Sequence, residues 1–394
     1  THSPHGADNG NKKTLTKTGE TYKGLSLFFI RHFQSGHLSM NSDTGEIIIE
    51  GRRLTLGEIL DVARGRRGVA ISSDPGFAAK IKRSQDVLMA ALEKGAPVYG
   101  VNTGYGKSCE KRMAMEVSTR NGSNLIRFHG CGTGAAVGIQ EVRAAMLTRI
   151  LCFSRGYSGA SMELIRHLAE FLNRGITPVV PCEGSVGASG DLTPLSYIAA
   201  ALMGEGEVFY RDSRVPAAEA LRLEGLAPYT FAPKEPLAMM NGTSIMTGIA
   251  ALAIDRTRRI LDASICATAL SIHALMGNAH HYDPVISRAK PHPGQDHVAR
   301  KISELLQSNE DHEKLAATTL ESLQDPYSLR CSPQILGVAY DALEWITRWV
   351  EIEANSANDN PLFDPDAGTV LMGGNFYGGH IVFAMDSLKA AVAS

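Results

Sequence analysis

Most of the chain carries apolar side chains at the three- and four-residue spacing of an amphipathic α-helix. The spacing is clear in residues 74–95, 139–156 and 161–175, each of which ends at a glycine that can terminate a helix. Thr55 precedes a shorter helical pattern, LGEILDVA, and can cap its first turn. Runs typical of strands are short, such as IIIE and the hairpin pattern EVFYRDSRVP. The pattern predicts a mainly α fold with a small mixed α/β region near the N-terminus.

The longest apolar stretch, residues 236–278, contains no proline after Pro236 and no strong stop signal. Its apolar residues cover most of the circumference of a helix, so we expect one very long helix here. A helix of this kind must be surrounded by other helices, which predicts a bundle of long helices. Charged residues between Met246 and Met276 argue against a membrane span.

The pattern divides the chain into three parts. Residues 1–42 are a polar extension without the apolar region of a secretory signal, and we expect them to be disordered. Residues 43–190 are predicted to form an N-terminal domain that carries an irregular loop, VYGVNTGYGKSC, and a glycine-rich segment. Residues 191–394 are predicted to form the long-helix bundle. The last helical pattern continues to Ser394 with no stop signal, which indicates a bundle truncated at its C-terminal end.

Composition narrows the class of partner. With 39 basic and 41 acidic residues the net charge is -2, so no basic field is available to attract nucleic acid or an anionic membrane. The six cysteines contain no CxxC pair and are typical of a reducing cytoplasm. We expect no metal site, because His280 and His281 are adjacent and point to different helix faces, and no HExxH motif occurs. The expected partner is a small molecule.

The glycine-rich segment GSVGASGDLTPLS, residues 184–196, precedes a helix that Thr193 is predicted to cap, with Pro194 in the first position. Its spacing matches neither phosphate-binding glycine motif, and no lysine follows. It also lacks the G-x-S-x-G spacing of a serine nucleophile. A third interpretation uses every residue: the Gly190 nitrogen attacks the Ala188 carbonyl carbon, and loss of water, including the Ser189 hydroxyl, leaves an electrophilic methylidene-imidazolone.

Ala188-Ser189-Gly190, followed by Asp191-Leu192, resembles the self-processed tripeptide of the aromatic amino acid ammonia-lyase and aminomutase family. In that family the tripeptide becomes 4-methylideneimidazole-5-one (MIO), with no external cofactor. The resemblance extends from about Ile47 to Ser394 through motifs in the family's order: VYGVNTGYG, GSVGASGDLTPLS, LAMMNGTSIMTG, QDPYSLRCSPQ, NSANDNP and GGNFYGG. It implies a homotetramer whose active sites are shared between chains.

The resemblance assigns roles to residues of the site. Tyr99 matches the loop tyrosine that removes the Cβ proton as general base, and Arg330 matches the residue that binds the substrate carboxylate. Asn241, Gln324 and Tyr327 match positions that bind substrate or orient the electrophile, and Phe376 matches one that packs beside the ring. From the residues alone, the preferred interpretation of Tyr99 is a half-buried core tyrosine, and an arginine such as Arg330 is more often a surface residue.

Phe128 and His129 match the pair that selects the substrate. An imidazole at 129 can hydrogen-bond a ring hydroxyl or another imidazole and has no partner on phenylalanine. Together with a likeness to bacterial tyrosine ammonia-lyases, this favours elimination of ammonia from L-tyrosine to give a trans-cinnamate-type acid. The alternatives are a histidine ammonia-lyase that gives urocanate, a tyrosine or phenylalanine 2,3-aminomutase, and, in a different class, an inactive truncated scaffold.

Overall fold

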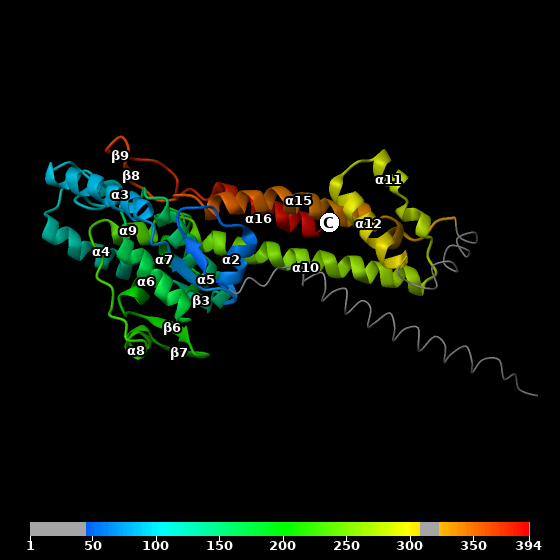
Figure 1. The fold of residues 1–394 in the computed structure, drawn as a ribbon, viewed down its shortest axis with the longest axis horizontal. Helices are drawn as coiled ribbons and strands as arrows, with labels where there is room; N and C mark the ends of the chain where they lie inside the picture. The colour runs from blue at the N-terminus through cyan, green and yellow to red at the C-terminus, as the bar shows by residue number, and fades with distance from the viewer. Residues whose placement is uncertain (1–44, 308–322, 394) are drawn as a thin grey trace, which may run out of the picture. The chain divides into compact units, whose positions relative to one another are not determined.

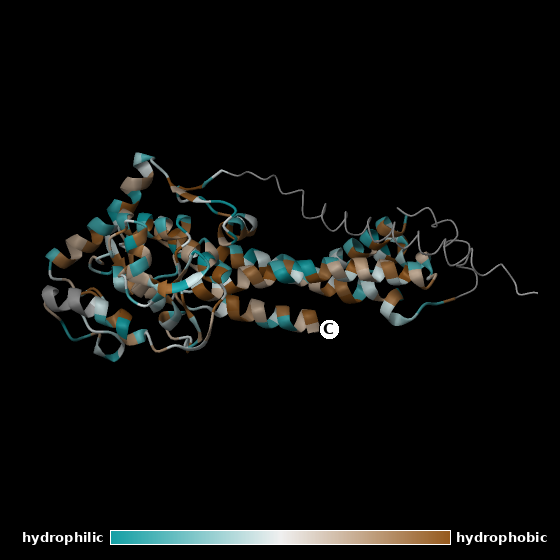
Figure 2. Ribbon diagram, turned by 90° about the horizontal axis from the view of Figure 1, so that it is seen from below, coloured by the Kyte–Doolittle hydropathy of each residue, from teal (hydrophilic) through white to brown (hydrophobic). Residues whose placement is uncertain are grey.

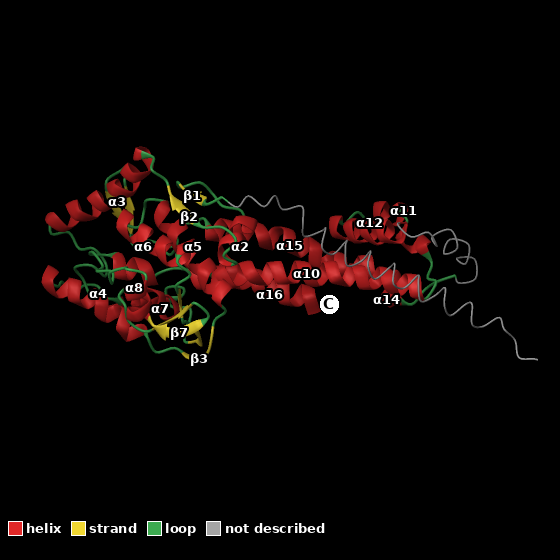
Figure 3. Cartoon of the chain, turned by 60° about the horizontal axis from the view of Figure 1, so that its bottom comes forward, coloured by secondary structure: helices red, strands yellow, loops and turns green. Residues whose placement is uncertain are grey.

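The computed structural model describes residues 45–307 and 323–393, and these residues form the predicted mainly α fold with small sheets (Figure 3). The described residues divide into two compact units. The larger contains residues 45–258 and 338–393, and the smaller contains residues 259–307 and 323–337. The predicted extension, residues 1–42, lies outside the described residues. The predicted domains, residues 43–190 and 191–394, stay a prediction.

The larger unit begins with a parallel strand pair, β1 (Ile47–Ile49) and β2 (Val69–Ile71), connected through helix α2 (Leu56–Ala63). Thr55 caps α2 as predicted: its hydroxyl accepts from the Glu58 main-chain N–H, and the Glu58 carboxylate accepts from the Thr55 N–H at 2.9 Å. These reciprocal bonds satisfy donors that the first helical turn leaves free. Helix α3 (Pro75–Glu93) follows and stops just before Gly95, again as the pattern predicts.

Helix α5 (Ile139–Ser154) packs between α2 and α6 (Met162–Asn173) in the larger unit (Figure 1). Every residue of α5 from Glu141 onward is buried, so this helix is enclosed on all sides. Its polar side chains therefore need partners inside the protein. Along the ribbons of the long helices, hydrophobic and hydrophilic residues are interspersed (Figure 2).

The larger unit contains further helices and strands. They include the predicted hairpin, which turns at Arg211 and Asp212, both with positive φ, as a tight hairpin turn requires. Their bounds are η1 Gly106–Ser108, α4 Met115–His129, β3 Thr133–Ala136, β4 Thr177–Pro178, β5 Pro181–Glu183, α7 Leu192–Leu202, β6 Glu207–Tyr210, β7 Ser213–Pro216, α8 Ala217–Leu223, β8 Leu362–Asp364, β9 Thr369–Leu371 and α16 Gly379–Ala393. Strands β3 and β5 pair, β6 pairs with both β4 and β7, and β8 pairs with β9.

The prediction of one uninterrupted helix over residues 236–278 is wrong. The structure has a short helix α9 (Glu235–Met240) and a long helix α10 (Ser244–Ala274), separated by an extended break at Asn241 and Gly242. Gly242 has a φ of 150°, and a Cβ there would lie 2.5 Å from a guanidinium nitrogen of Arg149. The main chain at Gly242 approaches other segments too closely for a side chain, which explains why this position is a glycine.

The predicted cap of α7 is also wrong. Asp191 occupies the N-cap position, and Thr193 and Pro194 lie inside the first turn. The Asp191 side chain makes no capping bond, because its carboxyl accepts instead from the Met246 N–H at 2.9 Å. A long-range contact therefore takes the place of the local one.

The smaller unit contains η2 (Ala279–Tyr282), α11 (Pro284–Ala289), α12 (Pro293–Gln307) and α14 (Tyr327–Arg330). Helix α15 is Ser332–Ala354, and its Trp345 and Trp349 pack on Phe383 of α16 within the larger unit. Among the described residues, no helix combines the length and the apolar character that crossing a membrane requires.

Candidate active site

The tripeptide Ala188-Ser189-Gly190 lies in a sharply bent turn immediately before α7. Ser189 has a φ of 52°, in the left-handed region that residues with a side chain rarely adopt, and Gly190 has a φ of 77°. The turn is tied to the break between α9 and α10: Asp191 N donates to Gly242 O at 2.7 Å, and Gly242 N donates to Ser189 O at 3.1 Å. A segment distant in sequence thus holds the tripeptide through two main-chain hydrogen bonds.

Gly190 has no room for a side chain. A Cβ at this position would lie 2.2 Å from the carbonyl oxygen of Gly242 and 2.9 Å from that of Phe376. The main chain of Phe376 therefore lies against the tripeptide. A bent turn whose nucleophilic residue lacks a Cβ is what closure of a five-membered ring requires, so these residues fit the MIO group.

Arg149 on α5 is hydrogen-bonded to the main chain at the break between α9 and α10. Its side chain is fully buried, and its guanidinium donates to the carbonyl oxygens of Asn241, at 2.9 Å, and Ala238, at 3.2 Å. A third donor reaches Oδ1 of Asn358. A buried arginine is tolerated only when such acceptors surround it. Arg149 is not among the residues predicted from the sequence. A charged residue in the middle of a buried helix nevertheless indicates a structural or functional role.

Asp191 directly follows the tripeptide and is a buried carboxyl group, 3% exposed. Burial raises its pKa from the ordinary 3.8 to about 7, against the opposing effect of the Met246 N–H. Burial also raises the pKa of Glu353, which accepts from the Thr243 hydroxyl beside the break. Two acids therefore bind protons more readily than usual, one directly after the tripeptide and one hydrogen-bonded to Thr243 after the break.

We expect Asp191→Asn to remove part of the pH dependence of stability. The folded state favours protonated Asp191. The contribution of this group to the free energy of unfolding is therefore fully present below about pH 4 and is lost as the pH rises through about 7. The free energy of unfolding of the wild type, minus that of the variant, should fall by about 1 kcal/mol per pH unit across this window. Urea unfolding at several pH values measures this difference, and a constant difference would contradict the assignment.

The loop that carries Tyr99 is held by side chains and not by regular secondary structure. The Asn102 side chain accepts from Val98 N at 2.7 Å and donates to Ala96 O at 2.8 Å. The Tyr99 hydroxyl is half-buried and accepts from the Gly106 N–H at 3.0 Å. The prediction of an irregular loop over residues 98–109 is confirmed apart from the single turn η1.

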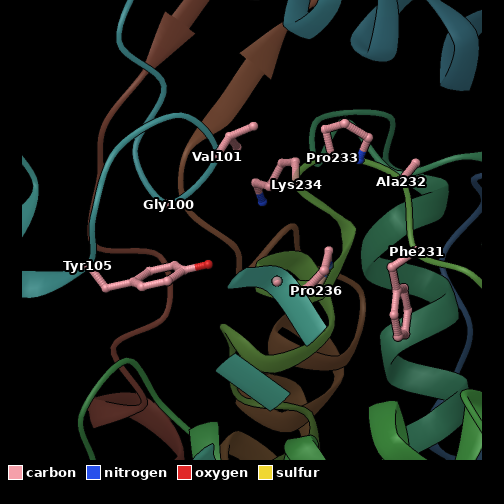
Figure 4. A pocket seen from close by; sticks show the side chains of 9 residues that line it. Gly100, Val101, Tyr105, Phe231, Ala232, Pro233, Lys234 and Pro236 are labelled. Atoms are coloured by element: carbon pink, nitrogen blue, oxygen red, sulfur yellow. The ribbon is translucent and has the colours of Figure 1, made fainter. Parts of the chain in front are cut away.

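A small pocket lies beside this loop (Figure 4). Gly100 and Val101 of the loop line one side, and Lys234 and Pro236 from the start of α9 line the other. Tyr105 points its hydroxyl toward the space between them (Figure 4). Burial and the nearby Tyr99 raise the pKa of Tyr105 to about 12, so Tyr105 stays neutral.

The predicted selectivity pair lies in the last turn of α4. Phe128 is 80% exposed, and its ring contacts that of His129. Nδ1 of His129 lies 2.9 Å from the carbonyl oxygen of Leu125. Because a carbonyl only accepts, Nδ1 carries a proton, and in the neutral imidazole Nε2 is then a hydrogen-bond acceptor.

Three of the predicted site residues belong to the smaller unit. Tyr327 and Arg330 lie on α14, with the guanidinium 4.8 Å from the centre of the Tyr327 ring. The Nε atom of Arg330 donates to Asp325 O at 3.4 Å. Gln324 is exposed just before α14. The structure thus brings Tyr327 and Arg330 together, and in the larger unit it brings Asn241 and Phe376 to the tripeptide.

A mainly α fold with a self-cyclising tripeptide defines the class of ammonia-lyases and aminomutases that depend on MIO. The family model described as aromatic amino acid lyase matches residues 54–394, and the chain belongs to this family. The predictions of the family, of the mainly α fold and of a carbon–nitrogen lyase are confirmed.

Relatives with assigned names include a histidine ammonia-lyase of Myxococcus xanthus (strain DK1622), 39% identical over 346 residues that cover 88% of this chain and 67% of the relative. The solved structure of Pantoea agglomerans phenylalanine aminomutase is similar at a TM-score of 0.81 and 34% identity, covering 88% of this chain and 69% of that one. The solved structure of histidine ammonia-lyase from Trypanosoma cruzi is similar at a TM-score of 0.78 and 30% identity. The match covers 88% of this chain and 65% of that one.

Proposed function

We propose that the protein catalyses the non-oxidative elimination of ammonia from an aromatic amino acid, with L-histidine as the preferred substrate and urocanate as the product. The observation that carries the proposal is the turn at Ser189 and Gly190, which is bent and free of side-chain obstruction where ring closure needs it. MIO formed from Ala188, Ser189 and Gly190 supplies an electrophile for the substrate amine. The relative in Myxococcus xanthus supports histidine over the tyrosine that the sequence favoured.

The other steps belong to side chains of this chain. In the proposal, Tyr99 removes the Cβ proton, and the Gly106 N–H stabilises negative charge on its phenolic oxygen. Arg330 binds the substrate carboxylate through its planar fork, which stacking on Tyr327 helps to orient. Gln324 and Tyr327 contribute to substrate binding. We also propose a homotetramer whose sites are completed by more than one copy.

His129 supports a substrate whose ring carries a hydrogen-bond donor. Its Nε2 is an acceptor, because Nδ1 donates to Leu125 O. A histidine imidazole and a tyrosine hydroxyl both offer such a donor, and phenylalanine does not. Tyrosine is therefore the second candidate substrate, and in the proposal Phe128 supplies apolar surface for the substrate ring.

The experiment that tests the proposal is turnover of histidine, tyrosine and phenylalanine by the full-length protein, with separate measurement of ammonia and of the organic product. Release of ammonia together with urocanate is expected. A β-amino acid without net loss of ammonia would identify an aminomutase. Absence of reaction with all three amino acids would favour an inactive scaffold and contradict the proposal.

We expect His129→Leu to lower kcat/KM for histidine by about 10- to 100-fold, because the substrate imidazole then loses its hydrogen-bond partner. The value for phenylalanine should change far less. Phe128→Leu serves as the matched control and should keep the preference for histidine over phenylalanine. An equal fall for both substrates in His129→Leu would exclude His129 as a selectivity residue.

A further inference from the structure

Lys234 and Asp359 form an ion pair in which neither side chain is exposed. Removing two charges from water costs more free energy than their attraction returns, unless the remaining polar atoms are also satisfied. Lys234 in addition has a φ of 76°, a conformation that a residue with a side chain rarely adopts. A pair maintained at this cost beside the candidate site calls for a functional explanation.

The second oxygen of Asp359 orders a neighbouring amide. While Oδ2 binds Lys234, Oδ1 accepts from the Asn360 N–H at 2.6 Å and from Nδ2 of Asn241 at 3.3 Å. The same Nδ2 donates to Asn360 O at 2.8 Å. Because both partners of Nδ2 are acceptors, the Asn241 carboxamide satisfies them in one orientation only.

This orientation leaves Oδ1 of Asn241 without a hydrogen-bond partner in the described part of the chain, although the residue is only 2% exposed. A buried acceptor without a donor costs about 1–3 kcal/mol, and a donor supplied by a ligand would remove this cost. Asn241 directly precedes Gly242, which is hydrogen-bonded to Ser189 and Asp191. The free acceptor is thus on the segment that holds the tripeptide, where the amine of an amino acid is to be bound.

We propose that the Lys234–Asp359 ion pair is a positioning device that fixes the Asn241 carboxamide with Oδ1 as an acceptor for the substrate amine. This inference rests on the proposed function. Lys234 and Asp359 act through Asn241 and are positioning residues. Lys234 neutralises the carboxylate, and the carboxylate in turn keeps Nδ2 of Asn241 from rotating toward the substrate.

The first test is Asp359→Asn, which keeps the shape of the side chain and removes its charge. Its carboxamide has one oxygen for three donors, Lys234, Asn241 and the Asn360 N–H. The charged ammonium of Lys234 is the strongest of these donors and takes the oxygen, so the new NH2 group faces Asn241. We expect kcat to fall about 100-fold with a much smaller change in KM, because the orienting contact and not the pocket is lost. A kcat within a few-fold of the wild type would overturn the inference.

Two double variants separate positioning from charge neutralisation. Lys234→Met with Asp359→Asn and Lys234→Met with Asp359→Leu both remove the two charges, and only the first keeps an oxygen that accepts from Asn241. We expect the first to return to within about tenfold of the wild-type kcat and the second to stay about 100-fold below it. Equal kcat in both, at similar melting temperatures, would show that the pair only stabilises the fold.

Crystal structures of the wild type and Asp359→Asn provide a readout that needs no turnover. Nδ2 of Asn241 should remain on Asn360 O in the wild type and leave it in the variant, and an unchanged carboxamide would overturn the inference. A wild type that releases ammonia from none of the three amino acids would instead contradict the proposed function. Intact mass of each variant establishes that a lower kcat does not reflect failure to form MIO.

Discussion

Ser189→Ala is expected to lower turnover about a thousandfold or more, because alanine has no hydroxyl to lose and the exocyclic methylidene cannot form. The variant should still fold, since the Ser189 contact to Gly242 is made by main-chain atoms. Steady-state release of ammonia from histidine measures the effect, and circular dichroism measures the folding.

Ser185→Ala is the matched control for this substitution. Ser185 lies in the same segment and its hydroxyl donates to Gly190 O at 3.3 Å, but it contributes no atom to the proposed ring. We expect this variant to retain activity within about tenfold, as for the loss of one ordinary hydrogen bond. Comparable activity in Ser189→Ala and Ser185→Ala would contradict a reaction that depends on the tripeptide.

Tyr99→Phe is expected to lower kcat by about 100- to 10,000-fold, the contribution typical of a general base. The phenolic oxygen accepts from Gly106 N, so the substitution removes one loop contact in addition to the base. Processing of the tripeptide should be unaffected, since Tyr99 has no part in ring closure. Kinetics with histidine, together with the intact mass of the variant, separate the two effects.

Tyr105→Phe provides the comparison, because the Tyr105 ring lies 6.4 Å from that of Tyr99 in the same loop. Its hydroxyl stays neutral, so it is unsuited to accept the Cβ proton. We expect a fall in kcat of less than about tenfold. A larger loss in Tyr105→Phe than in Tyr99→Phe would reverse the assignment of the base.

The helices could be predicted where local sequence determines them. Thr55 and Glu58 form the capping box of α2 from residues three apart, and the glycine at position 95 follows the end of α3. The break at Gly242 could not be predicted in the same way. It depends on Arg149, which comes from α5 and donates to Asn241 O, a contact across 92 residues that no local pattern contains.

The candidate site was partly predictable for the same reason. The tripeptide is contiguous, so the chemistry of Ala188, Ser189 and Gly190 can be read from residue types alone. The buried pair of Lys234 and Asp359 is separated by 125 residues, and nothing in the local sequence shows that either side chain is buried. Long-range contacts, not propensities, decide which polar residues are enclosed.

Intact-mass spectrometry of the full-length protein measures whether Ala188, Ser189 and Gly190 have condensed into a ring. We predict a mass lower than that of the unmodified sequence by two water molecules, with the whole loss confined to the peptide that contains residues 188–190. A mass equal to that of the unmodified sequence, in protein that turns over substrate, would contradict it.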